Sequence, residues 1–161
     1  MGNKSEYENI GKICYNAFAF LILFMAFVVQ NIASDAFNKD GFGALGNYSL
    51  ATRYVANICG SLMGSAVFAK IGFKMMQFIG SLGYVAWLLA GMLPAYIASY
   101  DKDQSESIFF STGFVYALVL FASILNGFGS ALLWMGQGKY FADCSPESKK
   151  GLYYSLFWFI F

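Results

Sequence analysis

The chain has 161 residues, of which 58% are hydrophobic and 12% are charged, with a formal net charge of +1. Because soluble domains carry roughly 25% charged residues, this composition predicts an integral membrane protein in contact with the lipid bilayer, and the small net charge argues against a nucleic-acid partner. The chain has no histidine, no nucleophile beside a base and no C-x-x-C pair, so we expect no catalytic residues, no metal site and no cofactor.

Residues 1–12 form a short polar leader, and the first apolar run, residues 13–33, is long enough to cross a hydrocarbon core of about 30 Å as a helix. Asn16 and Gln30 share one face of that helix, and Asn31 follows at its end as a cavity or interface candidate. Side-chain amides in lipid need hydrogen bonds to another helix or a polar cavity. We therefore expect this face to point inward, either for helix packing or for contact with a substrate.

A second helix is predicted over residues 47–69, and it carries the only arginine of the chain. One helical stripe contains Arg53, Asn57, Gly60 and Gly64. The two glycines form a GxxxG pattern, which lets helices approach closely. A cation inside a membrane marks a functional site by default, but two turns from the helix end Arg53 could instead reach the membrane surface or pair with an aspartate of the preceding glycine-rich turn. Both interpretations stay open.

A hairpin loop at residues 70–74 leads into a third predicted helix, residues 75–99, and a fourth is predicted over residues 110–135, after an acidic loop at residues 100–107. Small residues on one face of a helix favour close packing, and polar side chains on a stripe favour an inward-facing surface. The packing candidates here are Gly80, Gly83, Gly127 and Gly129, and the cavity candidates are Asn126 and Gln137.

The last apolar run, residues 152–161, follows a charged connection over residues 137–151. Ten helical residues extend about 15 Å, which is half of a bilayer core. We therefore expect residues 13–161 to be the N-terminal part of a larger membrane domain, with four complete transmembrane helices and half of a fifth. The predicted fold class is an all-α polytopic membrane protein.

The lysines are unevenly distributed between the predicted loops. With a cytoplasmic N-terminus, only Lys39 and Lys102 lie outside, and the remaining lysines lie inside, together with Gly72 of the hairpin loop. The inner lysines are Lys4, Lys12, Lys70, Lys74, Lys139, Lys149 and Lys150. Because cytoplasmic loops carry the excess of Lys and Arg, the sequence predicts that the N-terminus is cytoplasmic, in either the plasma membrane or an endomembrane.

Several local patterns follow one another along nearly the whole chain. They are Gln30-Asn31; Lys70-Ile71-Gly72-Phe73-Lys74 with Gly80 and Gly83-Tyr84; GSALLWMGQGKY from Gly129 to Tyr140; and Lys150-Gly151, Tyr154 and Leu156-Phe157-Trp158. In this order and spacing they resemble the uncoordinated-ninety-three (Unc-93-like) family, whose members are also called ion channel regulatory proteins. This family is a divergent branch of the major facilitator superfamily.

The resemblance implies a bundle of twelve membrane helices in two halves, of which this chain covers the N-terminal portion. It also implies a non-catalytic role as a regulator of potassium channels or an escort of receptors, with a channel or receptor subunit as partner. The hairpin departs from the superfamily pattern G-x-x-x-D-[RK]-x-G-[RK]-[RK], because Ala69 stands in place of the Asp and Phe73 in place of a base. This departure argues against transport.

The predicted spans also contain no Asp or Glu that could carry a coupling proton. The alternative function is nevertheless a major-facilitator secondary transporter of a small solute, which would use a polar cavity between helices. That cavity would be lined by Asn16, Gln30, Arg53, Asn57, Asn126 and Gln137.

Overall fold

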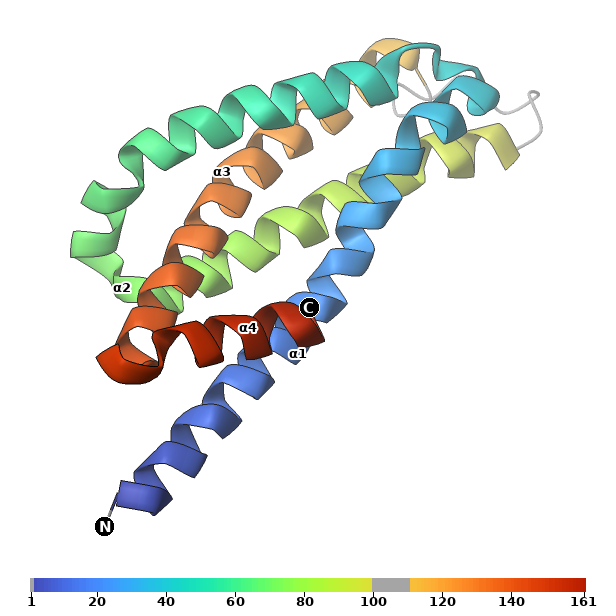
Figure 1. Cartoon of the computed structure of the whole chain (residues 1–161). Coiled ribbons are helices and arrows are strands. Elements are labelled where there is room, and N and C mark those ends of the chain that lie inside the picture. The colour runs from blue at the N-terminus through green and yellow to red at the C-terminus, as the bar shows by residue number, and fades with distance from the viewer. Residues whose placement is uncertain (1, 100–110) are drawn as a thin grey trace.

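The computed structural model describes residues 2–99 and 111–161, and all regular elements in these residues are helical. In chain order they are α1 (Gly2–Phe37), a π-helical turn η1 (Asn38–Phe42), α2 (Leu45–Ser99), α3 (Thr112–Cys144), a short 3₁₀ turn η4 (Glu147–Lys149) and α4 (Lys150–Ile160) (Figure 1). The predicted all-α class is therefore confirmed for the part of the chain that the structure describes.

Helix α1 is longer at both ends than the predicted span of residues 13–33. The polar leader, residues 2–12, is helical and continuous with the apolar segment. Lys12 and Glu8 form an ion pair of 2.8 Å one turn apart, a spacing that supports a helix. Hydrophobicity indicates which residues lie in the membrane. Backbone hydrogen bonding determines where the helix begins and ends, and here it continues into the polar residues of the leader.

A tight connection between α1 and α2 depends on two glycines. Gly41 has φ +89° and Gly43 has φ +54°, a left-handed conformation that glycine adopts without steric cost. The connection is held from α3, since the Tyr116 hydroxyl donates to the carbonyl oxygen of Phe42 at 2.6 Å. The predicted glycine-rich turn is therefore shorter than expected, because α1 continues to Phe37 and α2 begins at Leu45.

Helix α2 is a hairpin of two arms that meet at Gly72, where the backbone leaves the helical region (φ 71°, ψ 168°). We call residues 45–71 the first arm and residues 73–99 the second arm. The two predicted helices, 47–69 and 75–99, fall within these arms. The positive φ at Gly72 is what permits the chain to reverse within the short loop that the sequence predicted.

Helix α3 is longer than the predicted span of residues 110–135, and it includes the first part of the predicted connection at residues 137–151. It continues through Gln137 to Cys144, because nothing in that stretch stops a helix before Pro146, whose preceding residue is disfavoured from helical conformation. The Ser111 hydroxyl caps the start by accepting from the backbone N–H of Phe114 at 3.3 Å. Residue 110 and the acidic loop at residues 100–107 lie outside the described residues.

Helix α3 packs between the two arms of α2 (Figure 1). A methyl group built on Gly60 would lie 2.9 Å from the Ala131 side chain, and one built on Gly80 would lie 2.5 Å from the carbonyl oxygen of Gly129. Both arms therefore approach α3 at glycines, which is how helices gain van der Waals contact in lipid. The short helix α4 lies across α1, where Phe157 is fully buried.

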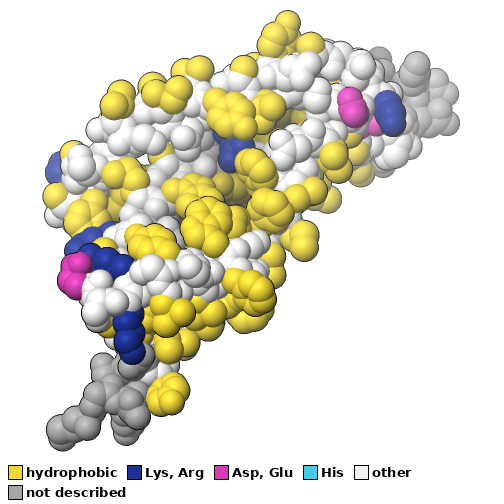
Figure 2. All heavy atoms as spheres, in the orientation of Figure 1, with side chains coloured by type: hydrophobic (Ala, Val, Ile, Leu, Met, Phe, Trp, Pro, Cys, Tyr) yellow, Lys and Arg dark blue, Asp and Glu magenta, His cyan; other side chains and the backbone are white. Residues whose placement is uncertain are grey.

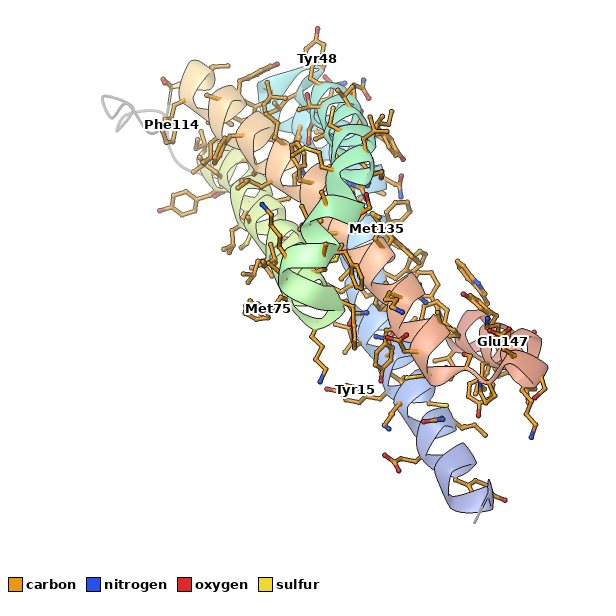
Figure 3. All side chains as sticks on the ribbon, turned by 90° about the vertical axis from the view of Figure 1, so that its left-hand side faces the viewer. Tyr15, Tyr48, Met75, Phe114, Met135 and Glu147 are labelled. Atoms are coloured by element: carbon orange, nitrogen blue, oxygen red, sulfur yellow. The ribbon has the colours of Figure 1, made fainter. Side chains whose placement is uncertain are left out.

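Three helical segments in the described residues are long and apolar enough to cross a membrane: Tyr7–Phe42, Leu45–Ser99 and Thr112–Cys144. The predicted count of four complete spans and half of a fifth is not confirmed. Hydrophobic side chains cover much of the surface in Figure 2, and most charged ones gather toward its two ends. Figure 3 shows Tyr48 and Phe114 toward one end of the bundle, and Tyr15 and Glu147 toward the other.

Candidate functional site

A cavity of about 210 Å³ lies between the four α-helices of the described chain. It is partly open, and every one of these helices contributes to its wall. The lining residues are Phe20, Leu23, Phe24 and Phe27 of α1, Arg53 and Tyr84 of the two arms of α2, Leu133 and Trp134 of α3, and Trp158 and Phe161 at the end of the chain. We call it the Arg53 cavity.

Aromatic rings form most of the wall. Phe20, Phe24 and Phe27 fall on one face of α1 because they are three or four residues apart. The ring of Phe20 lies edge-on to Trp134 at a centroid distance of 5.2 Å, and Phe24 lies edge-on to Phe161 at 5.3 Å. Edge-to-face contacts at these distances are favourable, so the rings hold one another in place and define the shape of the cavity.

The single arginine lies in this aromatic wall. Arg53 is only 5% exposed, and its guanidinium carbon is 5.3 Å from the centre of the Phe27 ring and 5.8 Å from that of Tyr84. Its Nε and Nη1 atoms are buried without a hydrogen-bond partner, and it takes part in none of the ion pairs found among the described residues. The site therefore holds a buried cation that ring faces surround, and no carboxylate in the described part of the chain neutralises it.

A polar region adjoins the arginine on its other side. Gln30, Ser49, Trp87 and Arg53 line a second, smaller cavity with no room for a water molecule. The indole Nε1 of Trp87 donates to the Ser49 hydroxyl at 2.9 Å, and that hydroxyl lies 2.7 Å from the hydroxyl of Ser123. Gln30 is buried with both amide atoms unpartnered. Of the predicted cavity residues, the structure brings Arg53 and Gln30 together here.

The other predicted cavity residues do not line the Arg53 cavity. Asn126 is fully buried with both amide atoms unpartnered, and Asn16 and Gln137 are buried elsewhere on α1 and α3. Asn57 donates to the carbonyl oxygen of Gly127 at 3.4 Å, which ties the first arm to α3. Asn31 is exposed, and its amide donates to the carbonyl oxygen of Phe27 at 3.0 Å within its own helix.

The predicted packing glycines all lie where α2 meets α3. A methyl group at Gly83 would lie 2.8 Å from the carbonyl oxygen of Leu125, one at Gly64 would meet the side chain of Met135, and one at Gly127 would meet the backbone of Arg53. Gly60, Gly80 and Gly129 make equally close approaches. Such approaches hold the first arm, and Arg53 with it, at a fixed distance from α3.

The predicted loop residues gather at one end of the bundle. Lys70 and Lys74 flank the Gly72 corner, and the ring of Phe73 in that corner lies 5.5 Å from the ring of Tyr140 near the end of α3. Lys139 pairs with Asp143 at 2.7 Å, and Lys150 pairs with Glu147 at 2.6 Å. These pairs are exposed, so each contributes little to stability.

The predicted cavity residues do not include the aromatic wall, although Phe20 and Phe27 share the face of α1 that the sequence predicts to point inward. The sequence prediction of the cavity rests on polar residues at helical spacing. The helical spacing of Phe20, Phe24 and Phe27 is the sequence signal that could have indicated the α1 side of the aromatic wall. The contributions of Trp158 and Phe161 depend on α4 folding back across α1, which no local pattern indicates.

In a comparison with known protein families, residues 104–161 match the family described as "Ion channel regulatory protein UNC-93". Curated relatives include UNC93-like protein MFSD11 of Xenopus tropicalis, which is 28% identical over 95% of this chain and 31% of its own length. Protein unc-93 homolog A of Bos taurus is 30% identical over 82% of this chain and 24% of its own length. UNC93-like protein 3 of Arabidopsis thaliana is 26% identical over 76% of this chain and 21% of its own length.

The chain thus spans between about a fifth and a third of the length of these curated relatives. No solved structure matches it significantly. The matches cover both halves of the chain, and the family match includes Trp134, Trp158 and Phe161, which line the Arg53 cavity.

Proposed function

We propose, from the premise that this chain belongs to the Unc-93-like family, that it forms part of a multi-pass membrane protein that regulates or escorts a membrane partner without catalysis. The partner we propose is an ion channel, such as a potassium channel, or a receptor subunit. The observation that carries this proposal is the match to the UNC-93 ion channel regulatory family. The description of that family names the regulation of an ion channel.

The membrane arrangement that we propose uses α1, each arm of α2 and α3 as four crossings, with α4 beginning a fifth. Each arm of α2 is long enough to cross by itself, since it contains more than the roughly 20 residues required. The N-terminus, the Gly72 corner and the α3–α4 connection would lie on the cytoplasmic side, where the lysine excess belongs. Lys39, in η1, would lie on the opposite side.

Co-expression with potassium channels tests the regulatory role. We expect the current through at least one channel, or its amount at the cell surface, to change when the protein is present, because regulation or escort acts on one of these quantities. Gly80→Leu, which disrupts the packing of α2 on α3, serves as an inactive control. Unchanged current and surface amount for the channels of a representative panel would contradict the proposal.

A secondary transporter is the second candidate, and the Arg53 cavity favours it. A cavity at the meeting point of several helices, lined by a buried cation, suits the midplane binding sites of transporters. The test is uptake of small solutes into liposomes that contain the purified protein. If the protein is a transporter, the liposomes take up a solute and Arg53→Gln abolishes this uptake. Solute uptake by the purified protein alone would also rule out a role limited to regulation.

A further inference from the structure

The buried guanidinium of Arg53 is electrostatically incomplete. Moving a charged group out of water is costly unless an opposite charge and hydrogen bonds compensate. Arg53 is 5% exposed, yet its Nε and Nη1 have no hydrogen-bond acceptor among the described residues. The site thus offers at least two unsatisfied N–H donors and one positive charge.

The surrounding rings compensate only part of this cost. Phe27, Tyr54 and Tyr84 lie within 5.3 to 5.8 Å of the guanidinium carbon, and ring faces attract a cation. The Tyr84 hydroxyl is directed to Ser130, to which it donates at 3.1 Å. The rings therefore stabilise the charge but supply no acceptor for its N–H groups. A carboxylate or similar acid group supplies both a negative charge and acceptors in the planar geometry of the guanidinium.

The rest of the Arg53 cavity determines what the acid group is attached to. Its other walls are aromatic or aliphatic, including Leu23, Leu133 and Trp134, so they favour an apolar body. Its volume of about 210 Å³ is below the roughly 300 Å³ at which pockets for drug-sized ligands begin. This size suits one aromatic ring or a short acyl chain.

We propose that the Arg53 cavity is a binding site for a small monovalent organic anion. Its acid group would pair with Arg53, and its aromatic or short acyl body would lie between the rings of α1, α3 and α4. The proposal goes beyond the regulatory function and holds whether the protein regulates a partner or transports a solute.

The experiment is a fluorine NMR titration of the purified chain in detergent micelles with 4-fluorobenzoate. The neutral 4-fluorobenzamide has a similar shape and serves as the matched ligand, and protein-free micelles give the baseline for partitioning. The variants are Arg53→Gln, Arg53→Lys and, as a control, Lys70→Gln, which removes an exposed positive charge at the Gly72 corner. Circular dichroism checks that each variant keeps its helix content.

We expect saturable binding of the benzoate to the wild-type chain and weaker binding of the benzamide. Arg53→Gln should weaken benzoate binding about ten- to hundred-fold, the range expected for losing a hydrogen bond to a charged group. Arg53→Lys should weaken it less, and Lys70→Gln should leave it unchanged. Benzamide affinity should be similar in all variants.

Equal affinities of the wild-type chain for benzoate and benzamide would overturn the proposal, because binding would then be apolar only. An unchanged benzoate affinity in Arg53→Gln would overturn it as well. If Arg53→Gln does not keep its helix content, the wild-type comparison of the two ligands and the Arg53→Lys variant decide the question. Failure of this test leaves the channel-regulating function unaffected, since that function is measured on currents.

Discussion

Arg53 combines two properties that rarely occur together in a membrane helix: it is charged, and it is almost fully buried without an ion-pair partner among the described residues. Residues of this kind are retained for function more often than for stability, since the charge is costly in an apolar environment. A structural role would instead require that the ring contacts with Phe27, Tyr54 and Tyr84 outweigh that cost. The stability of an Arg53 variant distinguishes these interpretations.

We predict that Arg53→Met leaves the free energy of unfolding unchanged or raises it, because methionine fills the space without a charge to desolvate. Unfolding in mixed micelles of increasing denaturing detergent measures this. A loss of about 3 kcal/mol or more, as large as the loss expected for breaking a buried ion pair, would show that Arg53 stabilises the fold and would contradict the interpretation that it is retained for function.

The Ser49 hydroxyl is the acceptor for the Trp87 indole, and it also joins Ser123 of α3. Ser49→Ala leaves a buried N–H without an acceptor, so we predict a loss of about 1–3 kcal/mol in the free energy of unfolding. Ser155→Ala is the matched control, because Ser155 is exposed and bonds only to the backbone of its own helix. Equal effects of the two variants would contradict the importance of this hydrogen bond.

At the scale of the elements, the packing of α3 between the two arms of α2 is the main structural feature. The arms approach α3 at glycines that lie directly against its backbone, as at Gly80, which faces Gly129 of α3. The periodicity of small residues was visible in the sequence, so the packing faces could be predicted. Which helix each face would contact could not, because periodicity gives the direction of a face and not its partner.

Alanine substitutions should separate packing glycines from incidental ones. Gly80→Ala places a methyl group 2.5 Å from the Gly129 carbonyl oxygen, so we predict that it destabilises the bundle by about 1–3 kcal/mol through overpacking. Gly138→Ala meets nothing within 4 Å and should stabilise α3 by up to about 1 kcal/mol through helix propensity. Thermal unfolding in detergent compares the two. A stabilising Gly80→Ala would contradict the described packing.

Helix ends were less predictable than helix centres. The apolar run around residues 110–135 was recognised, yet α3 continues to Cys144 because lysine and glutamine do not stop a helix. The Gly72 corner was predicted correctly because two apolar runs separated by five residues permit only a tight hairpin. The leader before residue 13 is helical for the same reason that α3 is long: backbone hydrogen bonding continues through polar residues, so a change in polarity does not mark the end of a helix.

At the scale of the whole molecule, the lysines of the Gly72 corner and of the α3–α4 connection lie near the N-terminal part of α1. Tyr140 of α3 joins these segments, because its ring contacts Phe73 of the corner and its hydroxyl donates to the carbonyl oxygen of Lys12 at 3.5 Å. Lys39 lies beyond the opposite end of α1.

Composition alone predicted a membrane protein. The Arg53 cavity could be predicted only in part, because Trp158 and Phe161 reach it through the chain reversal at Pro146.

The crossing of the membrane by the first arm of α2 on its own is the central claim of this account, and cysteine accessibility in sealed microsomes tests it most directly. Cys14, Cys59 and Cys144 are replaced by alanine, and single cysteines are introduced as Lys70→Cys and Lys39→Cys. Because the cytoplasmic face of a microsome points outward, an impermeant maleimide should label Lys70→Cys in sealed vesicles and Lys39→Cys only after detergent is added. Labelling of both positions from the same side would contradict the account.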